Sequence, residues 1–161
     1  MESAVSDIER LIAINEIREL MARYVRFADD KKFIDLASLF TPEGTFTPHK
    51  VNGDAWIRME GRENIAKIIT QGVGQAVAIH HLFSYETKVL TPTTAHSVIS
   101  MEDWVIHPDD EILPSNEIAF RTMHGFGHYH ADFVKIDATW YISKLVQTRV
   151  KMDFTYAKEG N

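Results

Sequence analysis

The strongest constraint on the fold of this chain is a change of hydrophobic period near Ala76. Before that point, apolar residues recur every three or four positions, as on one face of a helix. After it, apolar and polar residues alternate over long runs, as in half-buried strands. Helices followed by long antiparallel strands are typical of an α+β fold, in which the helices pack on one face of a curved sheet.

The first part of the chain predicts three helices. The run "SDIERLIAINEIRELMARYVRFADD", which begins at Ser6, has helical spacing, and Ser6 followed by acidic residues predicts an N-cap. A shorter helix is expected in "KKFIDLASLF", ended by "TPEG", and a third in "GRENIAKIITQGVG", which stops at glycines.

The second part predicts two hairpins of long strands. "AVAIHHLFSYETKVL" should pair with "AHSVISMEDWVIH" around the turn "TPTT", and "AFRTMHGFGHYHADFVKI" with "WYISKLVQTRVKMDF" around "DAT". No internal repeat or linker interrupts the 161 residues, so we expect a single domain over residues 1–161.

Composition argues against several classes of protein. The net charge is −6, from 23 acidic and 17 basic residues, and the basic residues are scattered, which disfavours nucleic acid as a partner. There is no cysteine, which fits a reducing compartment. Neither a signal peptide nor a run long enough to cross a bilayer is visible. We therefore expect a soluble cytoplasmic protein without a membrane partner.

The stretch "MHGFGHYHADF" carries three histidines, and strand alternation places His124, His128 and His130 on one face. Such a face could hold a metal with Asp132 in the manner of a cupin, or it could be a polar face or subunit contact. A cupin is nearly all β, whereas this chain begins with a helical pattern. We therefore predict no metal site and no cofactor.

The opposite face of the same strand carries Gly125, Gly127 and Tyr129. A strand gives up side chains where a ligand or another backbone must approach closely, or where the strand bends sharply. This face is therefore the unusual one of the strand.

Other candidate residues lie at the ends of the predicted elements. In the pair His80-His81, one side chain must face the helices, and alternation groups His80 with Ala78. Asp29 and Asp30 end the first helix.

Two charged residues interrupt the later strands. Asp103 lies within "SMEDWVI", where a carboxylate facing a core is costly. Arg149 shares a face of the last strand with Gln147 and Leu145. Both are therefore candidate site residues.

The runs "RYVRFADDKKFIDLASLFTPEGTF", "GRENIAKII", "HHLFSYETKVLTPTTAHSVISMEDW" and "GHYHADFVKIDATWYISKLVQTRV" resemble the SnoaL-like branch of the nuclear-transport-factor-two-like superfamily. The resemblance covers about residues 6–153 and extends to scytalone dehydratase, bile acid 7α-dehydratase and hexachlorocyclohexane dehydrochlorinase. It implies a cone-like α+β barrel, in which a curved antiparallel sheet and N-terminal helices enclose a cavity.

The resemblance also implies a set of catalytic residues. The family's Tyr-x4-Asp falls on Tyr24 and Asp29, and its histidine falls on His80, or on His81 if the alignment shifts by one. Such a histidine would be the general base, the aspartate its orienting partner, and the tyrosine a donor to an oxygen that becomes negative or leaves.

Further family positions imply a polar wall that binds substrate. They fall on Asp103 and, on the third long strand, on Gly127 and Tyr129. Glycine at the first of the latter two departs from the scytalone dehydratase pattern. The arginine of related enzymes falls on Arg149, with Leu145 as the alternative.

These residues suit a cofactor-free lyase of the dehydratase type, or an isomerase, acting on a small and largely apolar substrate, polycyclic ones included. The alternative is a non-catalytic small-molecule binder or an oxygenase accessory subunit on the same fold. The resemblance implies a homo-oligomer, a trimer or a dimer, formed through the outer face of the sheet with the loop "HPDDEILPSNE" and the histidine face.

Overall fold

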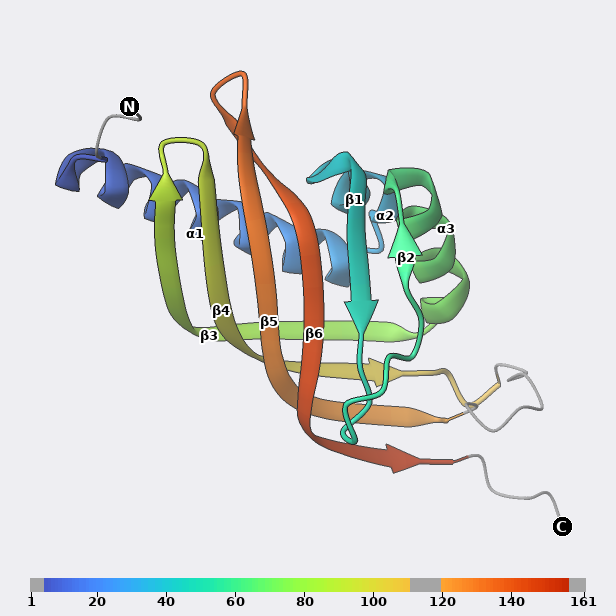
Figure 1. Cartoon of the computed structure of the whole chain (residues 1–161). Coiled ribbons are helices and arrows are strands. Elements are labelled where there is room, and N and C mark those ends of the chain that lie inside the picture. The colour runs from blue at the N-terminus through green and yellow to red at the C-terminus, as the bar shows by residue number, and fades with distance from the viewer. Residues whose placement is uncertain (1–4, 111–119, 157–161) are drawn as a thin grey trace, which may run out of the picture.

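The computed structural model of the chain describes residues 5–110 and 120–156 (Figure 1). Within these residues the helices are α1 (Asp7–Asp29), α2 (Phe33–Ser38) and α3 (Arg62–Val73). The strands are β1 (Phe40–Pro48), β2 (Met59–Glu60), β3 (Val77–Thr91), β4 (Thr94–Ile106), β5 (Thr122–Ile136) and β6 (Thr139–Thr155). In the part of the chain described, no helix is long and apolar enough to cross a membrane.

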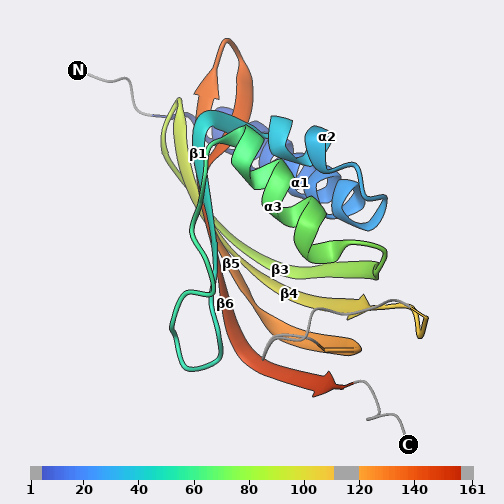
Figure 2. The ribbon, with the colours of Figure 1, turned by 90° about the vertical axis from the view of Figure 1, so that its right-hand side faces the viewer.

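The strands form one sheet in the order β2-β1-β6-β5-β4-β3. The two predicted hairpins are confirmed: β3 pairs with β4 and β5 with β6, both antiparallel. The sheet is not wholly antiparallel, because β1 lies parallel to β6. Figure 2 shows that the long strands bend strongly and that the helices occupy the concave side. The fold is therefore a cone-like α+β fold whose sheet curves without closing.

Strand β1 was not predicted from the sequence. The segment "TPEG", expected only to end a helix, lies inside it. The strand is irregular, with a register shift between Phe40 and Thr45, and it pairs with β6 about a hundred residues later in the chain. The local sequence pattern does not predict this strand, because the strand that it pairs with is distant in the sequence.

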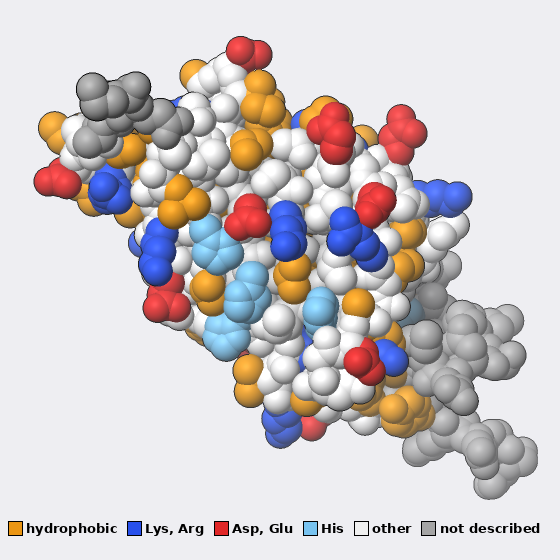
Figure 3. Space-filling view, viewed as in Figure 1, with side chains coloured by type: hydrophobic (Ala, Val, Ile, Leu, Met, Phe, Trp, Pro, Cys, Tyr) orange, Lys and Arg blue, Asp and Glu red, His pale blue; other side chains and the backbone are white. Residues whose placement is uncertain are grey.

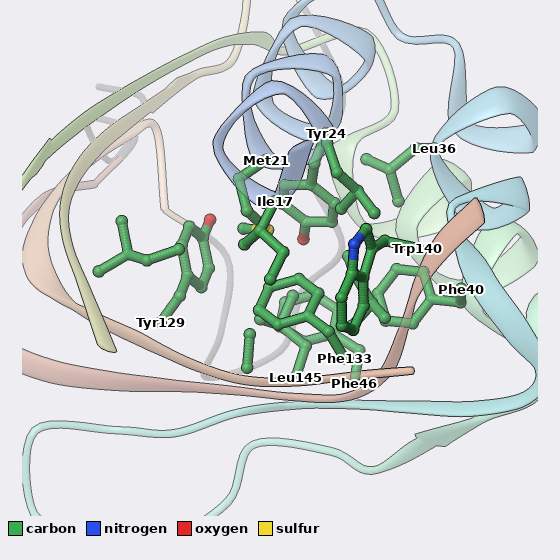
Figure 4. Close-up of a cluster of buried hydrophobic side chains, with 14 of the residues drawn as sticks. Ile17, Met21, Tyr24, Leu36, Phe40, Phe46, Tyr129, Phe133, Trp140 and Leu145 are labelled. Carbon is green, nitrogen blue, oxygen red and sulfur yellow. The ribbon is translucent and has the colours of Figure 1, made fainter. Parts of the chain in front are cut away.

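Helix α1 begins at the predicted cap. The Glu9 backbone N–H donates to the Ser6 hydroxyl at 3.2 Å, and the Ser6 backbone N–H donates to the Glu9 carboxylate at 2.9 Å. This reciprocal capping box satisfies two of the N–H groups that a helix start leaves unpaired. The other end of α1 is held by its buried face, which packs against the sheet through Ile17, Met21 and Tyr24 among others (Figure 4).

The bend in β5 depends on glycine. The β5–β6 register shifts between Phe126 and Gly127, and a Cβ added at Gly127 would overlap the carbonyl oxygen of Thr148 on β6. Only a residue without a side chain lets the two backbones approach so closely. This is the close backbone approach that the sequence suggested for the glycine face.

The three histidines of β5 lie on the outer face, as strand alternation predicted. His124 Nε2 lies 2.6 Å from a Glu102 carboxylate oxygen, and His130 Nε2 lies 3.0 Å from the Thr148 hydroxyl. Figure 3 shows histidine side chains gathered in the middle of this face. Across residues 5–110 and 120–156, no three histidine or acidic side chains group in a way that could hold a metal ion.

Candidate active site

A cavity of about 200 Å³ lies between the helices and the concave face of the sheet. Its polar lining consists of Tyr24, His80, Asp103, Tyr129, Gln147 and Arg149. Its apolar lining consists of Ala28, Phe33, Leu36, Phe46, Pro48, Ile69, Val73, Ala78, Val105 and Met123. We call this space the inner cavity. It brings together five of the residues predicted for the site, from α1, β3, β4, β5 and β6.

His80 and Asp29 form the shortest histidine–carboxylate contact of the inner cavity. His80 Nδ1 lies 2.7 Å from Asp29 Oδ1, and only 14% of the histidine side chain is exposed. A carboxylate on Nδ1 favours the tautomer with the proton on that nitrogen. Nε2 is then the nitrogen with a free lone pair, the form that a general base requires.

Asp29 reaches His80 without lining the inner cavity itself. On an ideal helix, Asp29 lies far around the axis from Tyr24, so the two would not share one wall. In the structure, α1 ends at Asp29, and from there the carboxylate reaches His80. Tyr24 lines the inner cavity, whereas Asp29 does not line it and contacts the imidazole of His80. Asp30, the neighbouring candidate, instead contacts Arg26 and Lys32 at the surface.

Tyr24 and Tyr129 form a buried pair (Figure 4). Their ring centroids are 5.7 Å apart and the ring planes are nearly perpendicular at 79°. Burial, with the nearby charge of Asp103, raises the pKa of Tyr24 well above its ordinary value, although the hydrogen bond from Tyr129 acts in the opposite direction. Burial raises the pKa of Tyr129 as well. Both hydroxyls therefore keep their protons at neutral pH and can act as hydrogen-bond donors.

Asp103 and Arg149 form a buried bidentate ion pair. Arg149 Nη1 lies 2.5 Å from Asp103 Oδ1 and Nη2 lies 2.8 Å from Oδ2, and both side chains are about 95% buried. Although burial lowers the pKa of Arg149, the hydrogen bonds and charge of Asp103 outweigh it and raise that pKa overall. The pair thus offsets the cost that a carboxylate within a strand would otherwise carry.

Gln147 joins this pair and was not predicted as a site residue. Its Nε2 lies 3.4 Å from Asp103 Oδ2, and the side chain is buried. The available signal was its position two residues before Arg149, on the same face of β6.

Two predicted substrate-binding residues do not line the inner cavity. His81 follows His80 on β3, so it points to the outer face, where 57% of its side chain is exposed and its ring lies 3.4 Å from Glu102. The backbone of Gly127 packs closely against the Thr148 carbonyl, and glycine has no side chain that could contact a substrate. Leu145, the alternative to Arg149, is fully buried in the core.

The curved sheet, the helices on its concave side and a closed polar cluster define a class: cone-shaped α+β proteins with an internal small-molecule cavity. The chain belongs to the SnoaL-like domain family, which matches residues 9–146. A comparison with curated proteins found no match.

Several solved structures share the fold. A proposed scytalone dehydratase of Novosphingobium aromaticivorans DSM 12444 is 15% identical, covers 97% of this chain and 100% of its own, and has a TM-score of 0.76. A type 3 hexachlorocyclohexane dehydrochlorinase of Novosphingobium barchaimii LL02 is 14% identical over 97% of this chain and 99% of its own, with a TM-score of 0.73. A proposed aromatic ring hydroxylase of N. aromaticivorans is 17% identical over 86% and 90%, with a TM-score of 0.69.

Proposed function

We propose that this protein is a cofactor-free lyase or isomerase that removes a proton from carbon in a small, largely apolar substrate. The observation that carries the proposal is the 2.7 Å contact between Asp29 and His80 at the edge of the inner cavity. A carboxylate in that position orients the imidazole and stabilises the imidazolium that forms when the base takes a proton.

Two polar residues of the inner cavity take part directly in this reaction. His80 Nε2 takes the proton from a carbon next to a carbonyl or similar acidifying group. Tyr24 donates its O–H to the oxygen that gains negative charge, or to the group that leaves. In an elimination, the electron pair of the broken C–H bond forms a double bond and expels a β-substituent. In an isomerisation, the proton returns to a different carbon.

The ion pair of Asp103 and Arg149, with Tyr129, completes the polar wall against which the substrate binds. Gly127 and His81 have no part in this proposal, because neither lines the inner cavity. Dehydratase and dehydrochlorinase structures of the same fold make elimination the more favoured of the two outcomes.

The first half of both reactions is tested by deuterium exchange. The methylene protons of 2-tetralone lie between its carbonyl and its aromatic ring, so their exchange in D2O, followed by NMR, reports proton abstraction without requiring the natural substrate. We expect exchange above the buffer rate with the wild-type protein. His80→Gln should remove it, and Asp29→Asn should lower it about 100-fold.

The control for this experiment is His81→Gln, which changes the neighbouring histidine on the outer face of the same strand. It should exchange at the wild-type rate. If His80→Gln exchanges as fast as wild type, or if the wild-type protein gives only the buffer rate, then His80 is not the base that we propose.

A non-catalytic binder or an oxygenase accessory subunit is the second candidate. It is favoured by the fact that Arg149 and Asp103 satisfy each other without a ligand, and a proposed aromatic ring hydroxylase has the same fold. This function predicts ligand binding that His80→Gln leaves intact, together with no exchange by any variant.

We also propose that the chain forms a homo-oligomer through the outer face of the sheet. The support is that this face carries large apolar side chains beside its histidines, among them Phe83, which is 60% exposed, and the half-buried Phe126. Residues 111–117 of the loop expected to take part lie outside the described residues. Light scattering at micromolar concentration should give the mass of a dimer or trimer, and a monomer would contradict this.

A further inference from the structure

A second cavity, of about 260 Å³, lies next to the inner cavity. We call it the outer cavity. Its apolar lining consists of Pro48, Trp56, Ile57, Met59, Ile68, Phe120, Met123, Met152 and Phe154, completed by Gly72. The remaining lining residues are His49 and Arg149, and the histidine ring already contacts the Gly53 carbonyl at 2.8 Å. The outer cavity is therefore a surface for apolar groups, with aromatic and thioether side chains that adapt to rings.

The two cavities meet at three residues. Pro48, Met123 and Arg149 line both of them. Because these side chains line both cavities, the two spaces adjoin at this wall. Arg149, which is paired with Asp103, is part of the shared wall.

The size of the inner cavity supports this reading. Sites for small organic molecules usually measure about 300–1,000 Å³, and the inner cavity alone, at about 200 Å³, lies below that range. The two cavities taken together lie within it. A substrate larger than the inner cavity would have to extend part of its body into the outer cavity.

The charge of the shared wall restricts the substrate further. Both terminal nitrogens of Arg149 are held by the carboxylate oxygens of Asp103. The positive charge at the junction is therefore neutralised within the protein and is not presented to a ligand. An anionic group at this point would have to compete with a buried bidentate partner, which is unfavourable. An uncharged substrate meets no such cost.

We propose that the substrate is an uncharged, elongated molecule with two parts. A carbonyl-bearing head lies beside His80 and Tyr24, and an aromatic or alicyclic body lies in the outer cavity, with Arg149 between them. The assignment of the head rests on the proposed function, whereas the assignment of the body rests on the outer cavity alone.

Two ketones that differ only in the body test this inference. Cyclohexanone provides a head alone, and 4-phenylcyclohexanone adds one phenyl ring. Binding of each is measured by calorimetry and by the fluorescence of Trp56, which lines the outer cavity. Burying a phenyl ring should raise the affinity of the wild-type protein by about ten- to a hundredfold.

Variants at Gly72 show where that gain arises. Outside its own helix and chain neighbours, nothing lies within 4 Å of a Cβ added at Gly72, which lines the outer cavity. Gly72→Phe should fill the cavity and abolish the phenyl gain, while cyclohexanone binds as before. Gly72→Ala is the matched control and should keep the gain. Ile57→Asp, at a position that is 42% exposed, should also abolish it by placing a charge in the apolar wall.

The inference is overturned if the phenyl ring adds no affinity, or if its gain survives both Gly72→Phe and Ile57→Asp. The same titrations on His80→Gln separate this inference from the proposed function. The phenyl gain should persist in His80→Gln, because His80 does not line the outer cavity. If the wild-type protein shows the phenyl gain but no deuterium exchange, the two-part site stands and the catalytic role is refuted.

Discussion

Gly125 on β5 lies directly against Arg149 on β6, and a single methyl group at position 125 would overlap the guanidinium. It would also lie 2.7 Å from Asp103 Oδ1. Because Gly125 has no side chain, the ion pair of Asp103 and Arg149 can occupy the space beside it. Gly125 therefore leaves room for the ion pair of the inner cavity.

Gly125→Ala should destabilise the protein by about 1–3 kcal/mol, because an added methyl in a closely packed site forces its neighbours to shift. Urea unfolding gives the free energy. The matched control is Gly72→Ala, whose new methyl enters open space and should leave stability unchanged or raise it by up to about 1 kcal/mol. Equal stabilities for the two variants would contradict the role given to Gly125.

Asp103→Asn should cost about 3–5 kcal/mol in the free energy of unfolding, because it leaves the buried guanidinium of Arg149 without its charged partner. The double variant Asp103→Leu with Arg149→Met removes both charges and should recover most of that loss. Chemical denaturation of Asp103→Leu, of Arg149→Met and of the double variant measures the coupling. Additive losses would show that the two side chains do not stabilise each other.

Tyr24→Phe should lower deuterium exchange about 100-fold, because it removes a donor to the oxygen that becomes negative. The ring remains in the core, so the fold should be retained. Tyr141→Phe removes a hydroxyl from the same sheet outside the inner cavity and serves as the control. Wild-type exchange by Tyr24→Phe would exclude its hydroxyl from the reaction.

Ser6→Ala should destabilise the protein by about 1 kcal/mol, because it removes the side-chain half of the capping box on α1. Thermal unfolding should show a lower midpoint without a change in deuterium exchange. An exchange rate that falls with the midpoint would mean that the position of Asp29 depends on the far end of the helix.

We expect the free energy of unfolding to fall in mild acid because of His130 on the outer face of the sheet. Burial, followed by the charges of His128, His96 and His49, lowers the pKa of His130 below its ordinary 6.5. The unfolded chain therefore binds a proton at this site more readily than the folded one, so stability is full above pH 6.5 and declines as the pH falls through that value.

His130→Asn removes this group and should flatten that decline, as urea unfolding at a series of pH values would show. Thr148, the hydrogen-bond partner of His130, remains available to the amide. An unchanged slope would show that His130 is not the group responsible for the pH dependence.

Much of the fold could be read from hydrophobic period and local signals. The capping sequence at Ser6 marks the start of α1, and the alternation of β5 separates its histidine face from its glycine face. These features depend on residues only a few positions apart, so the sequence carries them directly. Strand β1 escaped prediction because its pairing with β6 joins distant parts of the chain.

The candidate site could also be predicted only in part from the sequence. Alternation on β3 grouped His80 with Ala78 and placed His81 on the other face, without deciding which face meets the helices. In the structure, His80 and Ala78 line the inner cavity and His81 is exposed. Family resemblance suggested Asp29 as the partner of the histidine, and it suggested Asp103 and Arg149 without showing that they pair with each other.

What the sequence by itself determined is the order of the three helices and the four long strands, and the separation of the histidine face of β5 from its glycine face. Only the tertiary structure decided that Asp103 is held by Arg149, that Gln147 joins them, and that two cavities meet at Arg149. The physical reason is that the contacts of Asp103 with Gln147 and Arg149 span 44 and 46 residues and depend on the curvature of the whole sheet, which no local pattern encodes.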